Sequence, residues 1–306
     1  MRILLFFLFC SWYANAQEVL FEGHIYDNKT KEPIPFVNLS FLETLRGSST
    51  DENGKFFLDV PKTYLEKKIH ISSLGYKDTI VAARTLYTTK KLNMVEDSFE
   101  LDEVVVTEDL GDSFVLNPIS SYDIKSGFYS SSTPWVLATY FPNIGAAKKY
   151  LGKITIFMQD NSDYKRNVSK FRVRIYDVDP KTKKPKNDLL RHSIVLESDR
   201  EKDFVSIDIS DFQIKVPQEG IYIGLEWLFV AYNWYMVKEI DNIDKEKTIF
   251  EDRFAPTFAG VYNKNNNFKV MVYGMGEWTD FEVRSKDRTK HLIPAVSLKL
   301  SREKKK

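Results

Sequence analysis

Aromatic side chains are the residues of this chain whose chemistry points most directly to a ligand. Four of the five tryptophans lie after residue 134, and the stretch 227–235 carries three further rings, Phe229, Tyr232 and Tyr235. Exposed rings stack on the apolar faces of sugars, whereas buried rings fill cores. The composition of this stretch leaves both roles open.

Strand periodicity divides these residues between two faces. In the stretch 221–229 the odd positions are apolar, so they are expected to face a core, and Trp227 is expected among them. Tyr222 and Glu226 then lie on the opposite face. The alternation breaks after Val230, so the residues that follow fall on a loop or strand end. The predicted ligand-binding residues, for a saccharide or envelope glycan, are Trp234, Tyr235, Tyr222 and Glu226.

Catalytic chemistry is not indicated. The chain has no Gly-x-Ser-x-Gly elbow and no phosphate-binding glycine-rich loop. A zinc peptidase needs a His with a Glu three residues on, yet the residues three positions after the four histidines are Asp27, Ser73, Val195 and Pro294. Carboxylate pairs such as Asp199 with Glu201 suit glycoside hydrolysis, but 43 acidic residues make close pairs unavoidable. We predict that the protein is not an enzyme and has no metal and no cofactor.

The first residues indicate export. Arg2 precedes an apolar run, and the segment ends on Ala14-Asn15-Ala16, which is typical of a cleaved signal peptide over residues 1–16. No later run is long and apolar enough for a transmembrane segment. The only cysteine, Cys10, leaves with the signal peptide, so disulfides are not expected. The expected location is the periplasm, the outer membrane surface or the medium of a gram-negative bacterium.

Charge is unevenly distributed along the chain. Residues 17–110 carry 11 basic and 17 acidic side chains, and the rest of the chain is correspondingly basic. Halves of opposite sign can dock on one another or meet different partners, and ordinary surface variation explains the asymmetry equally well. No concentrated basic face is present, so nucleic acid is not an expected partner.

The first half is rich in strand signals. Short alternating runs such as 36–41 and 55–60 are separated by turn residues, and Asp51-Glu52-Asn53-Gly54 predicts a tight turn with a positive φ at Gly54. Further strands are expected at 19–26, 69–74, 79–83, 90–94 and 101–107. Seven short strands predict a β-sandwich over residues 17–110.

Four motifs in this half follow one known pattern. They are Gly23-His24-Ile25-Tyr26-Asp27, Glu32-Pro33-Ile34-Pro35-Phe36-Val37, Thr50-Asp51-Glu52-Asn53-Gly54-Lys55-Phe56 and Ser73-Leu74-Gly75-Tyr76. Residues 18–108 resemble the carboxypeptidase regulatory-like domain. The resemblance implies a seven-stranded transthyretin-like sandwich that serves as an accessory module, and it does not imply peptidase activity.

A valine-rich segment ends this half. It is similar to the segment that follows the same domain in TonB-dependent outer-membrane transporters, where it makes an energy-coupling contact. The residues after it are too few for a transporter barrel. Two interpretations remain: the last strand of the sandwich, or a strand that adds to the sheet of an outer-membrane or periplasmic protein. The candidate partner-binding residues are Leu101, Asp102, Glu103, Val104, Val105 and Val106.

The second half predicts another all-β domain. Residues 111–134 are rich in serine and lack a sustained period, which predicts a linker. Alternating strands are then expected at 153–159, 171–178, 193–196, 204–209, 220–230, 268–273 and 295–300. They predict a jelly-roll-like or galactose-binding-like sandwich over 135–301, followed by a basic tail at 302–306. The predicted function is a non-catalytic envelope protein that binds a glycan, with an outer-membrane assembly component as the alternative.

Overall fold

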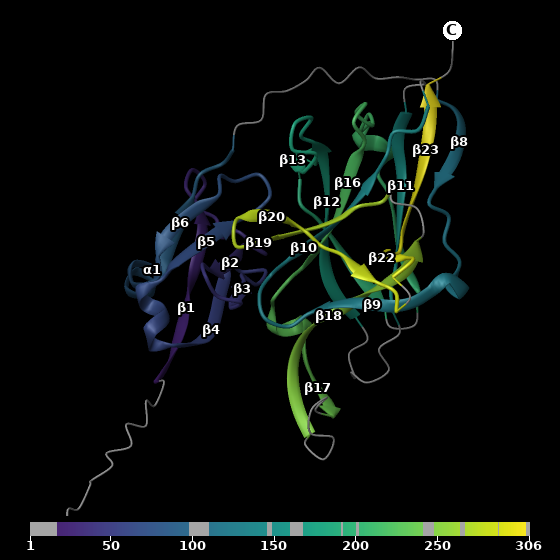
Figure 1. The fold of residues 1–306 in the computed structure, drawn as a ribbon. Coiled ribbons are helices and arrows are strands. Elements are labelled where there is room, and N and C mark those ends of the chain that lie inside the picture. The colour runs from purple at the N-terminus through teal and green to yellow at the C-terminus, as the bar shows by residue number, and fades with distance from the viewer. Residues whose placement is uncertain are drawn as a thin grey trace, which may run out of the picture.

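The computed structural model describes residues 17–97, 110–145, 149–159, 168–190, 192–199, 202–240, 248–263, 267–286 and 288–303. Strands dominate these residues, and they form two domains that lie side by side (Figure 1). The strands β1 to β7 pair only with one another, as do the strands from β8 onward. The prediction of two β-sandwich domains is therefore confirmed. The predicted signal peptide at 1–16 and the segment 101–107 lie outside the described residues.

The N-terminal domain consists of two small sheets around one core. One sheet has the order β4-β1-β7 and the other has the order β3-β2-β5-β6. All pairs are antiparallel except β1 with β7. Its elements are β1 (Glu18–Asp27), β2 (Asn38–Phe41), β3 (Gly47–Ser49), β4 (Lys55–Pro61), η1 (Lys62–Glu66), β5 (Lys68–Ser72), β6 (Thr79–Ala82), α1 (Ala83–Thr89) and β7 (Lys91–Met94).

Side-chain alternation explains why these residues form a sandwich. In β4, Phe56 is buried in the core, whereas its neighbour Phe57 lies on the outer face of the sheet. The predicted turn before β4 is present, because Gly54 has φ +70° and the Asp51 carboxylate accepts the amides of Asn53 and Lys55, each at 2.9 Å. Strand β3 and helix α1 were not predicted.

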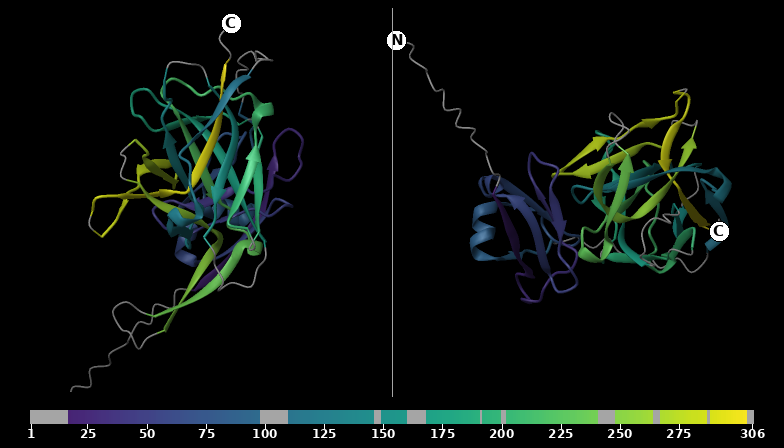
Figure 2. Two further views of the ribbon diagram at one scale, coloured as in Figure 1. Left: turned by 90° about the vertical axis from the view of Figure 1, so that its right-hand side faces the viewer. Right: turned by 90° about the horizontal axis from the view of Figure 1, so that it is seen from below.

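The C-terminal domain is larger and has three sheets, seen from two further directions in Figure 2. A seven-stranded sheet has the order β13-β12-β16-β10-β19-β20, with β14 also paired to β12. It packs on a four-stranded sheet, β15-β11-β23-β8, across the main hydrophobic core. A five-stranded sheet, β17-β18-β22-β21 with β9 paired to β18, completes the domain.

The bounds of the C-terminal elements complete the description. They are β8 (Leu110–Leu116), η2 (Ser121–Asp123), β9 (Ile124–Ser130), β10 (Val136–Phe141), β11 (Lys149–Phe157), β12 (Val168–Val178), β13 (Pro185–Asp188), β14 (Ile194–Asp199), β15 (Phe204–Asp208), η3 (Ser210–Phe212), β16 (Ile221–Trp227), η4 (Ala231–Asn233), β17 (Trp234–Ile240), β18 (Thr248–Asn263), β19 (Val270–Gly274), β20 (Glu277–Asp280), β21 (Val283–Arg284), β22 (His291–Pro294) and β23 (Val296–Glu303).

The predicted linker at 111–134 is wrong. Strand β8 pairs with β23, and β9 pairs with β18, so this stretch belongs to two sheets of the C-terminal domain. A buried serine is accommodated in β9, because the Ser130 hydroxyl donates to the carbonyl of Thr133 at 3.0 Å. Strand β8, which begins at Leu110, therefore already belongs to the C-terminal domain.

Strand β16 is buried on both faces. All seven residues from Ile221 to Trp227 are buried. One face packs in the main core, as the sequence predicted for Trp227, whose indole N–H donates to the Pro256 carbonyl at 2.8 Å. The other face is covered by the N-terminal domain and by a smaller hydrophobic cluster that includes Tyr176 and Met271. No helix within the described ranges is long and apolar enough to cross a membrane.

Candidate functional site

A groove of about 700 Å³ lies where the two domains meet. One wall comes from β3 and β4 of the N-terminal domain. The other wall comes from η4, the start of β17 and the middle of β18. We call this feature the junction groove. Its lining residues are Phe36, Arg46, Gly47, Ser48, Ser49, Asp51, Glu52, Asn53, Lys55, Phe57, Leu58, Asp59, Ser131, Ser132, Lys170, Phe229, Val230, Ala231, Tyr232, Trp234, Asp252 and Phe254.

Three exposed rings from both domains line the junction groove. The exposed fractions are 51% for Phe57, 46% for Tyr232 and 40% for Trp234. Clustered exposed apolar groups with a polar rim mark ligand or partner surfaces in soluble proteins. Because flat rings present an apolar face at little conformational cost, this set suits the stacking of a sugar or another flat ligand.

Buried polar contacts hold Tyr232 and Trp234 in place. Between them, Asn233 is fully buried and donates to the carbonyls of Lys170 at 2.6 Å and Leu228 at 2.9 Å. Its own side-chain oxygen accepts the Lys170 amide at 2.9 Å. The turn η4 is thus tied to β12, so the rings on either side of Asn233 project from a fixed backbone.

The floor of the groove is also fixed. Phe254 of β18 stacks on Phe229 with ring centroids 3.9 Å apart and an angle of 18° between the rings. At the rim, Lys170 forms an ion pair with Glu52 of the N-terminal domain, and this pairing raises the pKa of Lys170. Elsewhere in the lining, the Arg46 guanidinium donates to the Asp59 carbonyl at 2.8 Å.

The predicted ligand-binding residues do not lie together. Trp234 lines the junction groove. Tyr235, the next residue on β17, points to the opposite face, is only 7% exposed, and has its pKa raised mainly by burial. The expectation that these two rings share one platform is wrong, because β17 begins at Trp234 and adjacent strand residues alternate. The partner-binding candidates Leu101 to Val106 lie outside the described residues.

Tyr222 and Glu226 are not surface residues. Each is 1% exposed. The Tyr222 hydroxyl donates to the Lys183 carbonyl at 2.8 Å, and burial raises its pKa. The alternation placed them on the face of β16 opposite the main core, which the structure confirms, but the N-terminal domain and neighbouring side chains cover that face, so these two predicted ligand-binding residues lie beneath the surface. Glu226 has a different function, since it joins the two domains.

Glu226 accepts from two arginines of the neighbouring strand. Arg172 lies directly opposite Glu226 in the sheet and is 1% exposed. Its Nη1 is 2.9 Å from Glu226 Oε1, and Arg174 Nη1 is 3.2 Å from Glu226 Oε2. Burial lowers the pKa of Arg172, and the charge of Glu226 opposes that effect. Arg174 in turn pairs with Asp188, with Nε 2.5 Å from Oδ2. Both carboxylate oxygens of Glu226 therefore accept hydrogen bonds from arginine side chains.

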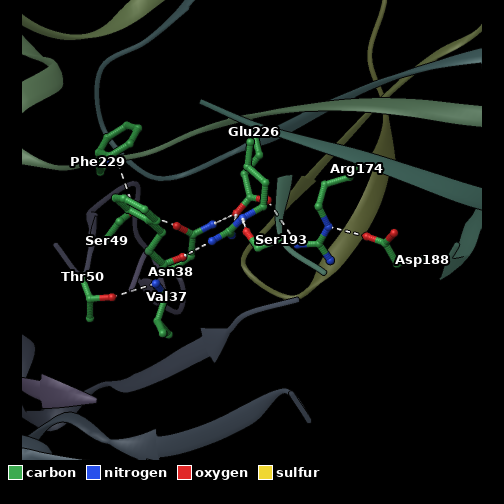
Figure 3. Close-up of polar contacts among 11 residues, drawn as sticks. Val37, Asn38, Ser49, Thr50, Arg174, Asp188, Ser193, Glu226 and Phe229 are labelled. Atoms are coloured by element: carbon green, nitrogen blue, oxygen red, sulfur yellow. Dashed lines mark hydrogen bonds and ion pairs between the residues drawn. The ribbon is translucent and has the colours of Figure 1, made fainter. Parts of the chain in front are cut away.

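The N-terminal domain completes this network, as Figure 3 shows. The Asn38 amide donates to Glu226 Oε1, and Arg172 Nη2 donates to the Phe36 carbonyl at 2.7 Å. Ser49 Oγ donates to Asn38 Oδ1 at 2.7 Å and accepts the Phe229 amide at 2.9 Å. We call these contacts the domain lock. Buried ions persist only where their hydrogen bonds are satisfied, so the lock holds the domains in one orientation.

A second hollow, of about 230 Å³, lies beside the domain lock. Arg174, Glu226 and Asp188 line it together with a cluster from both domains that consists of His70, Asp78 and Tyr273. In that cluster the carboxylate of Asp78 Oδ2 accepts from Tyr273 Oη at 2.9 Å and lies 3.1 Å from His70 Nε2. Burial would raise the pKa of Asp78, but the hydrogen bonds from His70 and Tyr273 outweigh it and lower the pKa.

The lowered pKa of Asp78 predicts a pH-dependent contribution to stability. A carboxyl whose folded-state pKa lies below its unfolded value of about 3.9 stabilises the fold above that value and loses the effect as pH falls through the folded pKa. Asp78→Asn should therefore lower the free energy of unfolding by about 1 kcal/mol near pH 6, since this side chain is half exposed. Urea titrations at about pH 6 and about pH 3 measure the effect, which should be smaller at the lower pH, because the unfolded chain is then largely protonated at this carboxyl. Asp97→Asn, at the rim of the same hollow, is the control. An equal loss at both pH values contradicts the prediction.

Several groove residues carried little sequence signal. The adjacent pair Phe56-Phe57 in an alternating strand indicates that one ring faces outward, and the structure places Phe57 there. Arg46, Ser48 and Asp59 have no such signal, because only the docking of β3 and β4 against the C-terminal domain makes them groove residues. No group of three or more His, Cys, Asp or Glu residues that could hold a metal occurs in the described part of the chain.

Comparison with known proteins supports the assignment of the first domain. Residues 21–106 match the family model of the CarboxypepD_reg-like domain, a regulatory and non-catalytic domain. The match confirms the predicted resemblance of the N-terminal domain to this family. No curated protein matches the chain. Among solved structures, "Structure of infectious bursal disease virus Gx strain" is 9% identical, with a TM-score of 0.19, over 93% of this chain and 63% of that chain. The likeness is too weak to inform fold or function.

Proposed function

We propose that this is an exported, non-catalytic protein of the bacterial cell envelope that binds a saccharide or envelope glycan in the junction groove. The observation that supports the proposal is the exposure of Phe57, Tyr232 and Trp234 around one groove with a polar rim. Pockets of this kind combine an apolar lining with a few polar groups that orient the ligand. The proposed location rests on the signal-peptide pattern of residues 1–16.

A binding assay with a ring deletion tests the proposal. Trp234→Ala should weaken binding to the glycan recognised by the wild type by about tenfold or more, by analogy with aromatic stacking worth ~1–3 kcal/mol per ring. A glycan array identifies the ligand, and affinity electrophoresis of Gln17 to Lys306 measures the dissociation constant. Retention of the wild-type circular dichroism spectrum shows that the variant folds.

The matched control is an exposed ring outside the groove. Tyr122 in η2 is 88% exposed and does not line the groove, so Tyr122→Ala should bind like the wild type. If the wild type binds no glycan, or if both variants bind as tightly as the wild type, the proposed site is wrong.

A second proposal is an assembly component of an outer-membrane system that uses Leu101 to Thr107. The observation in its favour is the position of β8, which follows this segment in sequence and ends its sheet. A strand at a sheet edge offers backbone groups to which a partner strand can add. Cross-linking in envelope extracts tests the proposal. A Val104→Asp, Val106→Asp variant should lose a specific cross-linked protein, and an unchanged pattern would reject this role.

A further inference from the structure

One face of the β17–β18 hairpin is exposed and carries apolar side chains. The strands pair Trp234 with Phe254, Met236 with Asp252, and Lys238 with Phe250. Because side chains alternate along a strand, these six residues share one face, which we call the hairpin face. The exposed fractions of Phe250 and Met236 are 67% and 52%. The opposite face contacts the protein through buried Tyr235 and half-buried Arg253.

The hairpin face continues the junction groove. Trp234, Asp252 and Phe254 belong to both. From Phe254 the strand runs four residues outward to Phe250, a distance of about 13 Å at the usual rise per residue. The hairpin projects away from the body of the C-terminal domain (Figure 1). The groove therefore does not end at Trp234 but opens onto a long, ring-bearing surface.

The charges along this surface are balanced. The groove is lined by four acidic side chains, Asp51, Glu52, Asp59 and Asp252, and by three basic ones, Arg46, Lys55 and Lys170. The hairpin face adds Lys238. Lys170 and Glu52 already pair with each other. A polyanionic ligand would gain no net attraction here, whereas an uncharged ligand can use both signs as hydrogen-bonding groups.

We propose that the junction groove and the hairpin face form one elongated site for an uncharged, linear polysaccharide that lies lengthwise across the domain junction. The inference rests on the proposed function and names its substrate class. A terminal sugar would fill only the groove between Phe57 and Trp234. A chain that also contacts Met236 and Phe250 uses the exposed rings and apolar groups that a single sugar leaves uncovered. Affinity therefore rises with the length of the ligand.

The test separates short from long ligands. Wild type, Trp234→Ala and a Met236→Ala, Phe250→Ala variant are titrated with neutral β-glucan, mannan and xylan, and with the disaccharide and hexasaccharide of each. The double variant should bind disaccharides within twofold of the wild type and should bind the corresponding hexasaccharide and polymer about tenfold more weakly. Trp234→Ala should weaken binding of all three lengths.

The control variant is Ile249→Ala. Ile249 lies on the same hairpin, one residue from Phe250, and faces the other way, so its removal should leave every affinity unchanged. Polygalacturonate and alginate are the charged probes. They should bind more weakly than the neutral polymers, and the neutral binding should change little with ionic strength.

The outcomes distinguish this inference from the proposed function. If Trp234→Ala loses binding but the double variant binds polymers like the wild type, the groove binds glycan and the elongated site is wrong. If acidic polymers bind best and salt weakens them, the uncharged class is wrong. If no saccharide of any length binds, the proposed function itself fails, and a protein ligand for the hairpin face takes its place.

Discussion

Replacing Glu226 with alanine is expected to lower the free energy of unfolding by about 3–5 kcal/mol, because it leaves buried Arg172 without its counter-ion. The same change removes the acceptor of the Asn38 amide, so contacts within and between the domains are lost together. Urea unfolding followed by tryptophan fluorescence measures the loss. Four of the five tryptophans lie after residue 134, so the tryptophan fluorescence reports directly on the C-terminal domain.

The control for this prediction is Glu277→Ala, because Glu277 is an exposed residue of β20. It should change the free energy of unfolding by less than about 0.5 kcal/mol. A loss below about 1 kcal/mol for Glu226→Ala would contradict the importance of the domain lock. It would mean that Arg172 finds water or another partner when the carboxylate is removed.

Gly47→Val is expected to destabilise the protein by about 2–3 kcal/mol through overpacking. A Cβ atom at Gly47 would lie 2.6 Å from the Leu39 carbonyl oxygen, 2.6 Å from Pro134 Cδ and 2.7 Å from Thr133 Oγ1. Two of these atoms belong to the C-terminal domain, whose Ser132 carbonyl accepts the Gly47 amide at 3.1 Å. The side chain therefore cannot fit unless the two domains move apart. Thermal unfolding and urea titration both detect the effect.

A glycine in open surroundings provides the comparison. Nothing lies within 4 Å of a Cβ atom built at Gly274 in β19, and its φ is not in the left-handed region. Gly274→Val should therefore be close to neutral. If Gly47→Val is equally neutral, the approach of β3 to the segment 131–134 is looser than the structure indicates.

Much of the N-terminal domain could be predicted from local pattern. Alternation in 19–26 and 55–60 anticipates β1 and β4, and the Asp51 to Gly54 motif anticipates the turn between strands. Strand β3 was missed because Gly47-Ser48-Ser49 has no apolar periodicity. Its amides are satisfied by contacts that include the Ser132 and Phe229 carbonyls of the other domain. A strand held by distant partners leaves no signal in its own residues.

The candidate site was predictable only in part, for the same reason. The break in alternation after Val230 correctly drew attention to Trp234, which lines the groove. Glu226 and Tyr222 were predicted to bind a ligand because a single strand does not reveal what covers the face opposite its core. The serine-rich stretch 111–134 has the composition of a linker, yet β8 and β9 find their pairing partners more than a hundred residues away, in β23 and β18.

The domain lock also has a kinetic consequence. Both walls of the junction groove are set before any ligand arrives, since Ser49 bonds to Phe229 and Asn38 to Glu226 in the free chain. Closure of a hinge would cost ordering entropy at each binding event and add a slow step to association. A groove with fixed walls avoids both. If the groove binds glycans as proposed, capture should be a single encounter-limited process, and differences between glycans should be seen in how long each one stays bound.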